Sequence, residues 1–267
     1  MDTILKLKKK FGFIAFYLRN NIAAAFEYRV SFFTQVLGMF INDSLWVFFW
    51  VLYFEKFQVL NGWTIKDLMV MWGVITFGFG LAHGFFYNIG RLPELINTGQ
   101  LDYYLALPKN PLLHICVSQI RPVNLGDCLF GPVLLIGFVH LNWQQWILFV
   151  IGGILSALIY LSFSIITGSL AFFLGRADAL AASLQTSLIH FTTYPTGIFK
   201  GWTRVLLFTL IPAGFIAEVP VDLIREFSAE KVLELSMASA IFLGLAVWVF
   251  QVGLKRYESG NLMVMRS

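Results

Sequence analysis

Charged residues are scarce in this chain. Lys, Arg, Asp and Glu make up 13% of its 267 residues, whereas a soluble domain carries about a quarter. Hydrophobic residues make up 58%, with 28 Phe and 8 Trp. Because so few charges could not keep so much apolar surface in water, the composition predicts that lipid surrounds most of the chain.

Cysteine is also rare, and the familiar catalytic motifs are absent. Cys116 and Cys128 have no histidine at ligand spacing, so we expect neither a disulfide framework nor a metal site. The sequence has no G-x-x-x-x-G-K-[ST] loop, H-E-x-x-H or G-x-S-x-G, so we expect no nucleotide site, no cofactor and no catalytic residues in the chain itself. No feature points to nucleic acid as a partner.

Long apolar segments are what the chain does have. A bilayer-crossing helix needs about 20 mostly apolar residues. Six segments qualify, and they are 30–54, 67–87, 112–140, 145–174, 179–199 and 232–254. We therefore predict an all-α polytopic membrane protein with six transmembrane helices in a single transmembrane domain, 1–267.

The distribution of Lys and Arg predicts the orientation of these spans. Six spans place both termini on one side, and that side then holds most of the 19 basic residues. The positive-inside rule assigns this side to the cytoplasm. Both termini and the 88–111 connection are therefore expected to be cytoplasmic.

Two further segments are expected to touch the membrane without crossing it. Residues 1–28 combine apolar residues at helical spacing with a cluster of lysines, which predicts an interfacial amphipathic helix. The 200–230 connection contains an apolar run too short to cross. We expect a re-entrant helix pair on the outer side, with Pro195, Pro212 and Pro220 as its turn points.

A few polar and small residues fall at membrane depth. Asp43 lies near the middle of the first span, where a charge costs about 2.5–3.5 kcal/mol, so it should face protein or water. Gly80 and Gly84 form a small-xxx-small pair. One polar stripe runs along 179–199 at three- and four-residue steps, and its members are Ser183, Thr186, Ser187, His190 and Thr193. These residues predict either helix packing or a translocation path and subunit interface. In the third span, Arg121, Asn124 and Asp127 are expected to reach headgroups, water or a partner.

The connection between the second and third spans and the C-terminal tail carry a family resemblance. The connection reads "LINTGQLDYYLALPKNPLLH" and the tail reads "GLKRYESGN". With six spans and a basic amphipathic N-terminus, the chain resembles the membrane permease subunit of a type-two ATP-binding-cassette (ABC) exporter, in the bacterial subfamily with a YESGN-like tail. The most specific positions are Gly99, Leu101, Asp102, Leu105, Pro108, Leu112, Tyr257, Ser259, Gly260 and Asn261.

The resemblance implies partners for the chain. The permease would lie in the bacterial inner membrane, pair with a second copy or a paralogous permease, and work with two copies of an ATPase subunit that binds ATP and Mg. The 88–111 connection would be the coupling helix that enters a cleft in the ATPase. Its contact residues would be Glu94, Leu95, Gly99, Leu101, Asp102, Tyr104, Leu105 and Pro108. Leu95, Leu101, Tyr104 and Leu105 would form an apolar knob, and Glu94 and Asp102 would pair with cations of the ATPase.

Two other functions remain open from the sequence. An ion-coupled secondary transporter would use Asp43 at the midplane, and a membrane-embedded lipid-modifying enzyme would need a catalytic constellation. In the exporter interpretation, the first, second and fifth spans are expected to line the interface between the two permease halves. Lipids, glycans, peptides and drugs fit the mildly polar path equally well.

Overall fold

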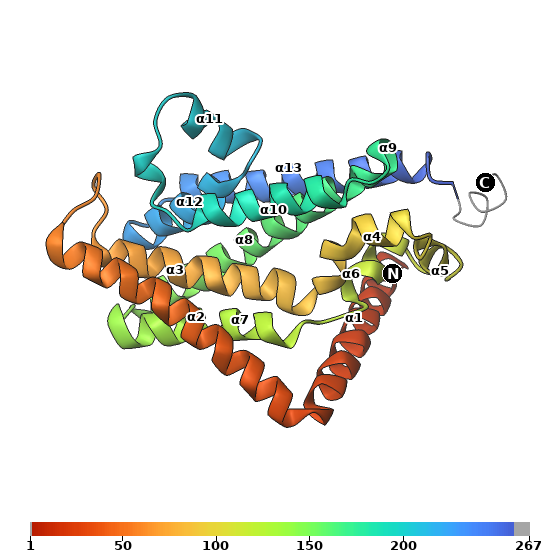
Figure 1. The fold of residues 1–267 in the computed structure, drawn as a ribbon, viewed down its shortest axis with the longest axis horizontal. Helices are drawn as coiled ribbons and strands as arrows, with labels where there is room; N and C mark the ends of the chain where they lie inside the picture. The colour runs from red at the N-terminus through yellow and green to blue at the C-terminus, as the bar shows by residue number, and fades with distance from the viewer. Residues whose placement is uncertain (1, 259–267) are drawn as a thin grey trace.

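A computed structural model describes residues 2–258 of the chain, with side chains described from residue 12 onward. All regular elements in this part of the chain are helices (Figure 1). In order they are α1 (Asp2–Glu27), α2 (Arg29–Lys56), α3 (Ile65–Phe79), η1 (Gly80–Gly84), η2 (Tyr87–Arg91), α4 (Leu92–Asn97), α5 (Leu101–Leu105), α6 (Pro111–Val117), α7 (Pro122–Phe138), α8 (Trp143–Ser169), α9 (Ala171–Leu174), α10 (Asp178–Thr192), η3 (Thr196–Ile198), α11 (Trp202–Thr209), α12 (Ala213–Arg225) and α13 (Ala229–Leu254).

Four of these helices are long and apolar enough to cross a membrane. They are α2, α3 continued by η1, α8 continued by α9, and α13. Two bent pairs raise the number to six, because α6 and α7 meet at 75° and α11 and α12 meet at 88°. The structure thus confirms an all-helical multi-pass protein.

The expected fifth span differs from the prediction. Its helix, α10, has only 15 residues, which at a rise of 1.5 Å per residue gives roughly 22 Å, less than the hydrocarbon core. Its polar stripe lowers its hydropathy, and Pro195 lies just beyond its C-terminal end. The α11–α12 pair, rather than α10, supplies the sixth candidate span.

The core of the bundle forms around α3 and α8. Most residues in the apolar window of each helix are buried, whereas few residues in the corresponding windows of α2 and α13 are buried. Only one stripe of α2 is buried, and it consists of Asp43, Val47, Trp50 and Phe54 at helical spacing. The rest of α2 presents apolar side chains outward, as expected for a helix that faces lipid or another subunit.

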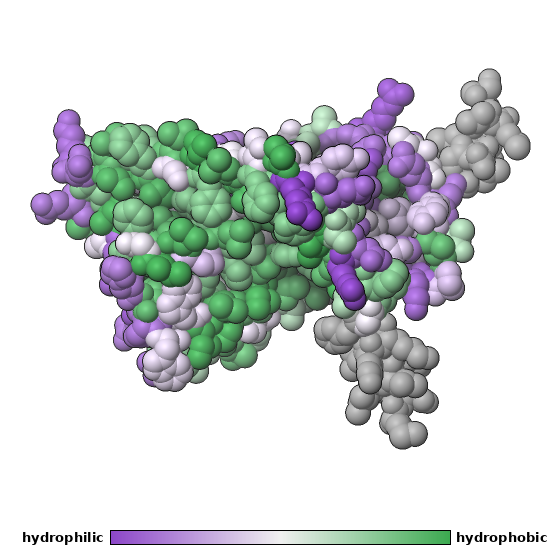
Figure 2. Space-filling view, turned by 90° about the horizontal axis from the view of Figure 1, so that it is seen from below, coloured by the Kyte–Doolittle hydropathy of each residue, from purple (hydrophilic) through white to green (hydrophobic). Residues whose placement is uncertain are grey.

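The surface divides along the length of the bundle. Figure 2 shows apolar residues over the middle of one face and hydrophilic residues gathered at its two ends. The start of α1, the end of α13, α4 and α5 lie at one end of the bundle, and the 57–64 loop lies at the other (Figure 1). This banding fits a bundle whose long axis crosses the bilayer.

A glycine and a proline lie at the turns that precede α11 and α12. Gly201, with a φ of +59°, precedes α11, and Pro212 precedes α12. Pro220 is not a turn point, because it lies inside α12 and packs against Gly152 of α8. An ion pair between Arg204 and Glu218 links the two helices.

Candidate functional site

The 88–111 segment folds as a chain of short helices at the end of the bundle where α1 starts and α13 ends (Figure 1). Pro93 lies in the first turn of α4, where its missing N–H costs nothing. Gly99 has a φ of +74° between α4 and α5. That backbone conformation favours glycine, so the reversal between the two helices depends on this position.

Three residues expected in the exposed knob are buried instead. Leu95, Leu101 and Tyr104 are 2%, 0% and 8% exposed. They join an apolar cluster with Ile165 of α8 and Phe250 of α13. These side chains therefore attach the segment to two membrane helices, and they do not present it to a partner.

The buried side chain of Asn88 connects the start of the segment to α5 and to the end of α6 by hydrogen bonds. The Asn88 amide donates to the Tyr104 hydroxyl at 2.9 Å and to the Ser118 hydroxyl at 2.7 Å. Asn88 is fully buried, so loss of these bonds would leave polar groups without water or protein partners. Nothing in the sequence spacing pointed to Asn88, because its partners lie 16 and 30 residues away.

The surface of the segment is formed by other side chains. Tyr103 is 62% exposed and Leu105 is 37% exposed, and Pro108 is also at the surface. Glu94 is exposed but already makes two hydrogen bonds with the guanidinium of Arg91, at 2.8 and 2.9 Å. These bonds lower the pKa of Glu94. Tyr103 is the exposed aromatic residue that the sequence analysis missed.

The beginning of the tail contacts this segment. Tyr257 packs on the same apolar cluster as Leu101. Burial, together with the neighbouring carboxyl group of Asp102, raises the pKa of Tyr257. Asp102 therefore has a neighbour within its own chain, and the tail residues Ser259, Gly260 and Asn261 lie outside the described residues.

Helix α1 is also tied to this end of the bundle. The Tyr17 hydroxyl lies 2.6 Å from Nε2 of His114 in α6. The Asn21 amide donates to the backbone carbonyl of Val117 at 3.0 Å. The N-terminal helix and the 88–111 segment therefore meet at α6.

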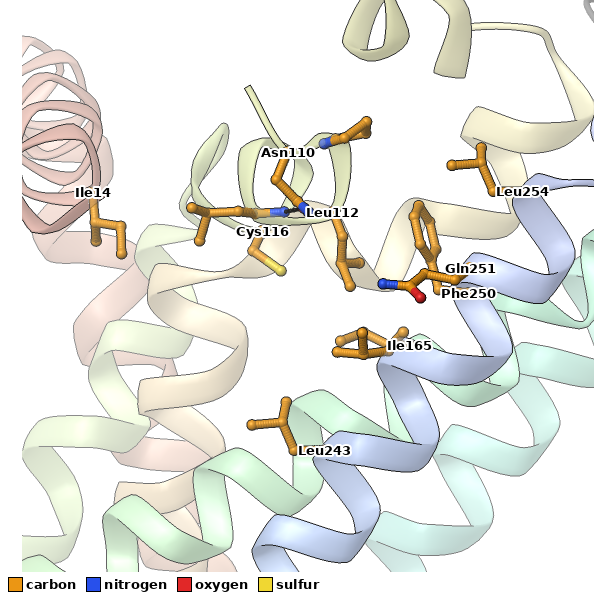
Figure 3. Close-up of a pocket in the computed structure, with 12 residues that line it drawn as sticks. Ile14, Asn110, Leu112, Cys116, Ile165, Leu243, Phe250, Gln251 and Leu254 are labelled. Carbon is orange, nitrogen blue, oxygen red and sulfur yellow. Dashed lines mark hydrogen bonds between the residues drawn. The ribbon is translucent and has the colours of Figure 1, made fainter. Parts of the chain in front are cut away.

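A pocket of about 550 Å³ separates α6 from α13. Leu112 and Cys116 project from α6 towards Ile165 and Leu243 on the other side of it (Figure 3). Because of this pocket, α6 is not close-packed against α13 along this face. Phe250 lines the pocket and also belongs to the apolar cluster that contains Leu101.

Two acidic side chains meet inside the bundle. Asp43 of α2 and Asp127 of α7 are 3% and 2% exposed, and their carboxyl groups interact directly. The amide of Asn124 donates to Asp127 at 3.3 Å. Asp127 and Asn124 were expected to reach headgroups, water or a partner, but the packing of α2 along α7 buries both.

The glycine pair of the second span packs within the chain. A Cβ at Gly80 would lie 2.2 Å from the backbone nitrogen of Cys128, and one at Gly84 would lie 2.8 Å from Leu125. Both neighbours are in α7. The pair therefore allows η1 to approach α7 closely, and it does not face a second subunit.

The polar stripe of α10 faces outward. Ser183, Thr186 and His190 are exposed, and Ser187 and Thr193 are partly exposed. The hydroxyls of Ser187 and Thr193 donate to carbonyls of their own helix. The stripe is thus open to another subunit or to a path beside α10.

The bundle, with its apolar middle and polar ends, defines a multi-pass membrane protein. Residues 40–260 match the sequence model of a family described as ABC-2 family transporter protein. The chain therefore belongs to this family and is the membrane component of an ABC transporter, a class that generally works with an ATPase partner. No curated protein matches the chain.

Proposed function

We propose that this chain forms one half of the translocation pathway of an ABC exporter. The 88–111 segment couples it to a separate ATPase subunit. The second half is another copy or a paralogous permease, and each half engages one of two ATPase subunits. ATP and Mg are bound by those subunits, and both termini face the cytoplasm of a bacterial cell.

The way the 88–111 segment is attached carries this proposal. Its inner face is fixed to α8 and α13 through Leu101 and Tyr104, while Tyr103 and Leu105 remain at the surface. A movement of the ATPase that displaces the outer face of the segment therefore also displaces the membrane helices packed on its inner face. An exposed aromatic residue beside an exposed leucine is a common anchor for a partner cleft.

The test is co-purification of the chain with the ATPase encoded in the same cell. The double variant Tyr103→Glu, Leu105→Glu places two charges on the exposed face and leaves the buried face unchanged. We expect the wild type to retain the ATPase and the variant to lose it while remaining in the membrane.

The matched control is Trp202→Glu. This aromatic side chain is 85% exposed and lies in α11, away from the 88–111 segment, so its replacement should leave the ATPase bound. Equal retention of the ATPase by the double variant and the wild type would contradict the proposal.

A further inference from the structure

A cavity of about 170 Å³ lies inside the bundle, bordered by α2, α3, α7, α8 and α10. Asp43 and Asp127 form its acidic part. Four of the other lining side chains are aromatic, and they are Trp46, Trp72, Phe79 and Tyr160. Thr193, the last residue of the α10 stripe, also lines it.

The acidic part has an oxygen atom without a partner. Asp127 accepts from Asn124, but Oδ2 of Asp43 is buried and has no hydrogen-bond partner among the described residues. Two carboxyl groups in one low-dielectric site repel each other when both are charged. The pair avoids this cost either by sharing one proton or by holding a positive group between the two carboxyls, and a charged carboxylate oxygen can only accept a hydrogen bond or face a cation.

The aromatic part selects the kind of cation. The rings of Trp46 and Trp72 stack with centroids 6.0 Å apart, and those of Phe79 and Tyr160 meet edge-on at 5.6 Å. Calcium-like metal ions require about six or more oxygen ligands. Aromatic rings instead attract alkylammonium groups through their π faces, most strongly when the site is dry.

We infer that this cavity binds the alkylammonium group of a cationic, amphipathic transport substrate. Asp43 and Asp127 supply the opposite charge, and the aromatic rings contact the alkyl substituents. The cavity holds the charged group, and the rest of the substrate lies along the exposed polar stripe of α10, from Thr193 towards Ser183. The inference rests on the proposed function, because it names the substrate class of the same pathway.

The probe for this site is radiolabelled benzyltrimethylammonium, measured by equilibrium binding to the purified full chain in lipid nanodiscs. We expect saturable binding that unlabelled benzyltrimethylammonium displaces. Neopentylbenzene, which has the same shape without the charge, should fail to displace it. Equal displacement by the neutral compound would overturn the inference, because the acidic pair would then contribute nothing.

Substitutions locate the site. Asp43→Asn and Asp127→Asn keep the side-chain shape and should each weaken binding by about tenfold or more. Glu55→Gln, an exposed position on the same helix as Asp43, is the matched control and should leave affinity unchanged. Unchanged affinity in both Asp variants would refute the site.

Two further measurements keep the test decisive. If the Asp variants do not fold, Trp46→Leu replaces them, because Trp46 is 38% exposed and its substitution should not prevent folding. Trp46→Leu should also weaken binding, and unchanged binding would contradict the inference.

Co-purification of the ATPase is measured on the same samples. Cation binding without ATPase binding would refute the proposed function and retain the site, whereas ATPase binding without cation binding would refute the site alone.

Discussion

The 88–111 segment and the intramembrane cavity bury polar groups of different kinds. Around the segment, the amide nitrogen of Asn88, the Tyr104 hydroxyl and the Ser118 hydroxyl bond to one another, and only Oδ1 of Asn88 in this group has no partner in the described part of the chain. In the cavity, two acidic groups are placed together and one oxygen of Asp43 has no hydrogen-bond partner among the described residues. A connected network of neutral groups stabilises one arrangement, whereas two neighbouring carboxyl groups repel each other when both are charged. The difference supports the proposed coupling role of the segment and the proposed cation site in the cavity.

The largest expected effect comes from breaking the attachment of the segment. Leu101→Asp places a charge at a fully buried position and should lower the free energy of unfolding by roughly 3–5 kcal/mol or prevent folding. Leu105→Asp, on the exposed face of the same helix, is the control. Thermal unfolding in detergent measures both, and similar unfolding temperatures would show that the two faces do not differ.

The comparison itself is tested by removing one polar group from each region. Asn88→Leu should lower the unfolding temperature, because it removes the two buried hydrogen bonds that Asn88 donates to Tyr104 and Ser118, at a cost of about 1–3 kcal/mol. Asp43→Asn should leave the unfolding temperature unchanged or raise it, because it removes a buried carboxyl that repels Asp127. A decrease of similar size in both variants would contradict the contrast between the two regions.

The Asp43→Asn substitution should separate substrate recognition from basal ATP hydrolysis. In reconstituted complexes, Asp43→Asn should abolish stimulation of the ATPase by benzyltrimethylammonium while basal hydrolysis continues. Stimulation that persists at the wild-type level would show that the cation acts elsewhere. The measurement compares hydrolysis rates with and without the cation at fixed ATP.

The smallest effect is expected from the Arg91–Glu94 ion pair. Both side chains are partly exposed, so Glu94→Gln should cost less than about 1 kcal/mol. Because the folded-state pKa of Glu94 is lowered, its contribution is present above the ordinary glutamate pKa and is lost as pH falls through the lowered value. The difference between wild type and Glu94→Gln should therefore vanish in acid. A difference that persists there would show that this pair is not its source.

Composition and periodicity were sufficient for the class of fold. Apolar length predicted α2, α3, α8 and α13, and the proline-rich connection predicted a bent pair at α11–α12. The length of α10 was overestimated, because the apolar residues beside its polar stripe continue beyond Thr192, where the helix ends. Pro220 was expected at a turn, but it lies inside α12 and packs against Gly152 of α8.

The sites were less predictable because they depend on contacts between distant residues. Asp43 stood out alone as an acid in an apolar span, but its partner Asp127 comes from a helix whose polar half pointed to the membrane surface. The 88–111 segment was located from its motif, yet the motif could not separate the buried Leu101 from the exposed Leu105. That distinction requires the positions of α8 and α13, against which the segment packs.

The central claim is that the 88–111 segment moves together with the membrane helices when the ATPases close. It is tested by spin labels at Gln100→Cys, an exposed position of the same segment outside the proposed ATPase contacts, in both permease copies of the assembled complex, in a background carrying Cys116→Ala and Cys128→Ala. The distance between the labels is measured by pulsed electron paramagnetic resonance without nucleotide and with trapped ATP. The account predicts a shorter distance with ATP, and an unchanged distance while the ATPases dimerise would contradict it.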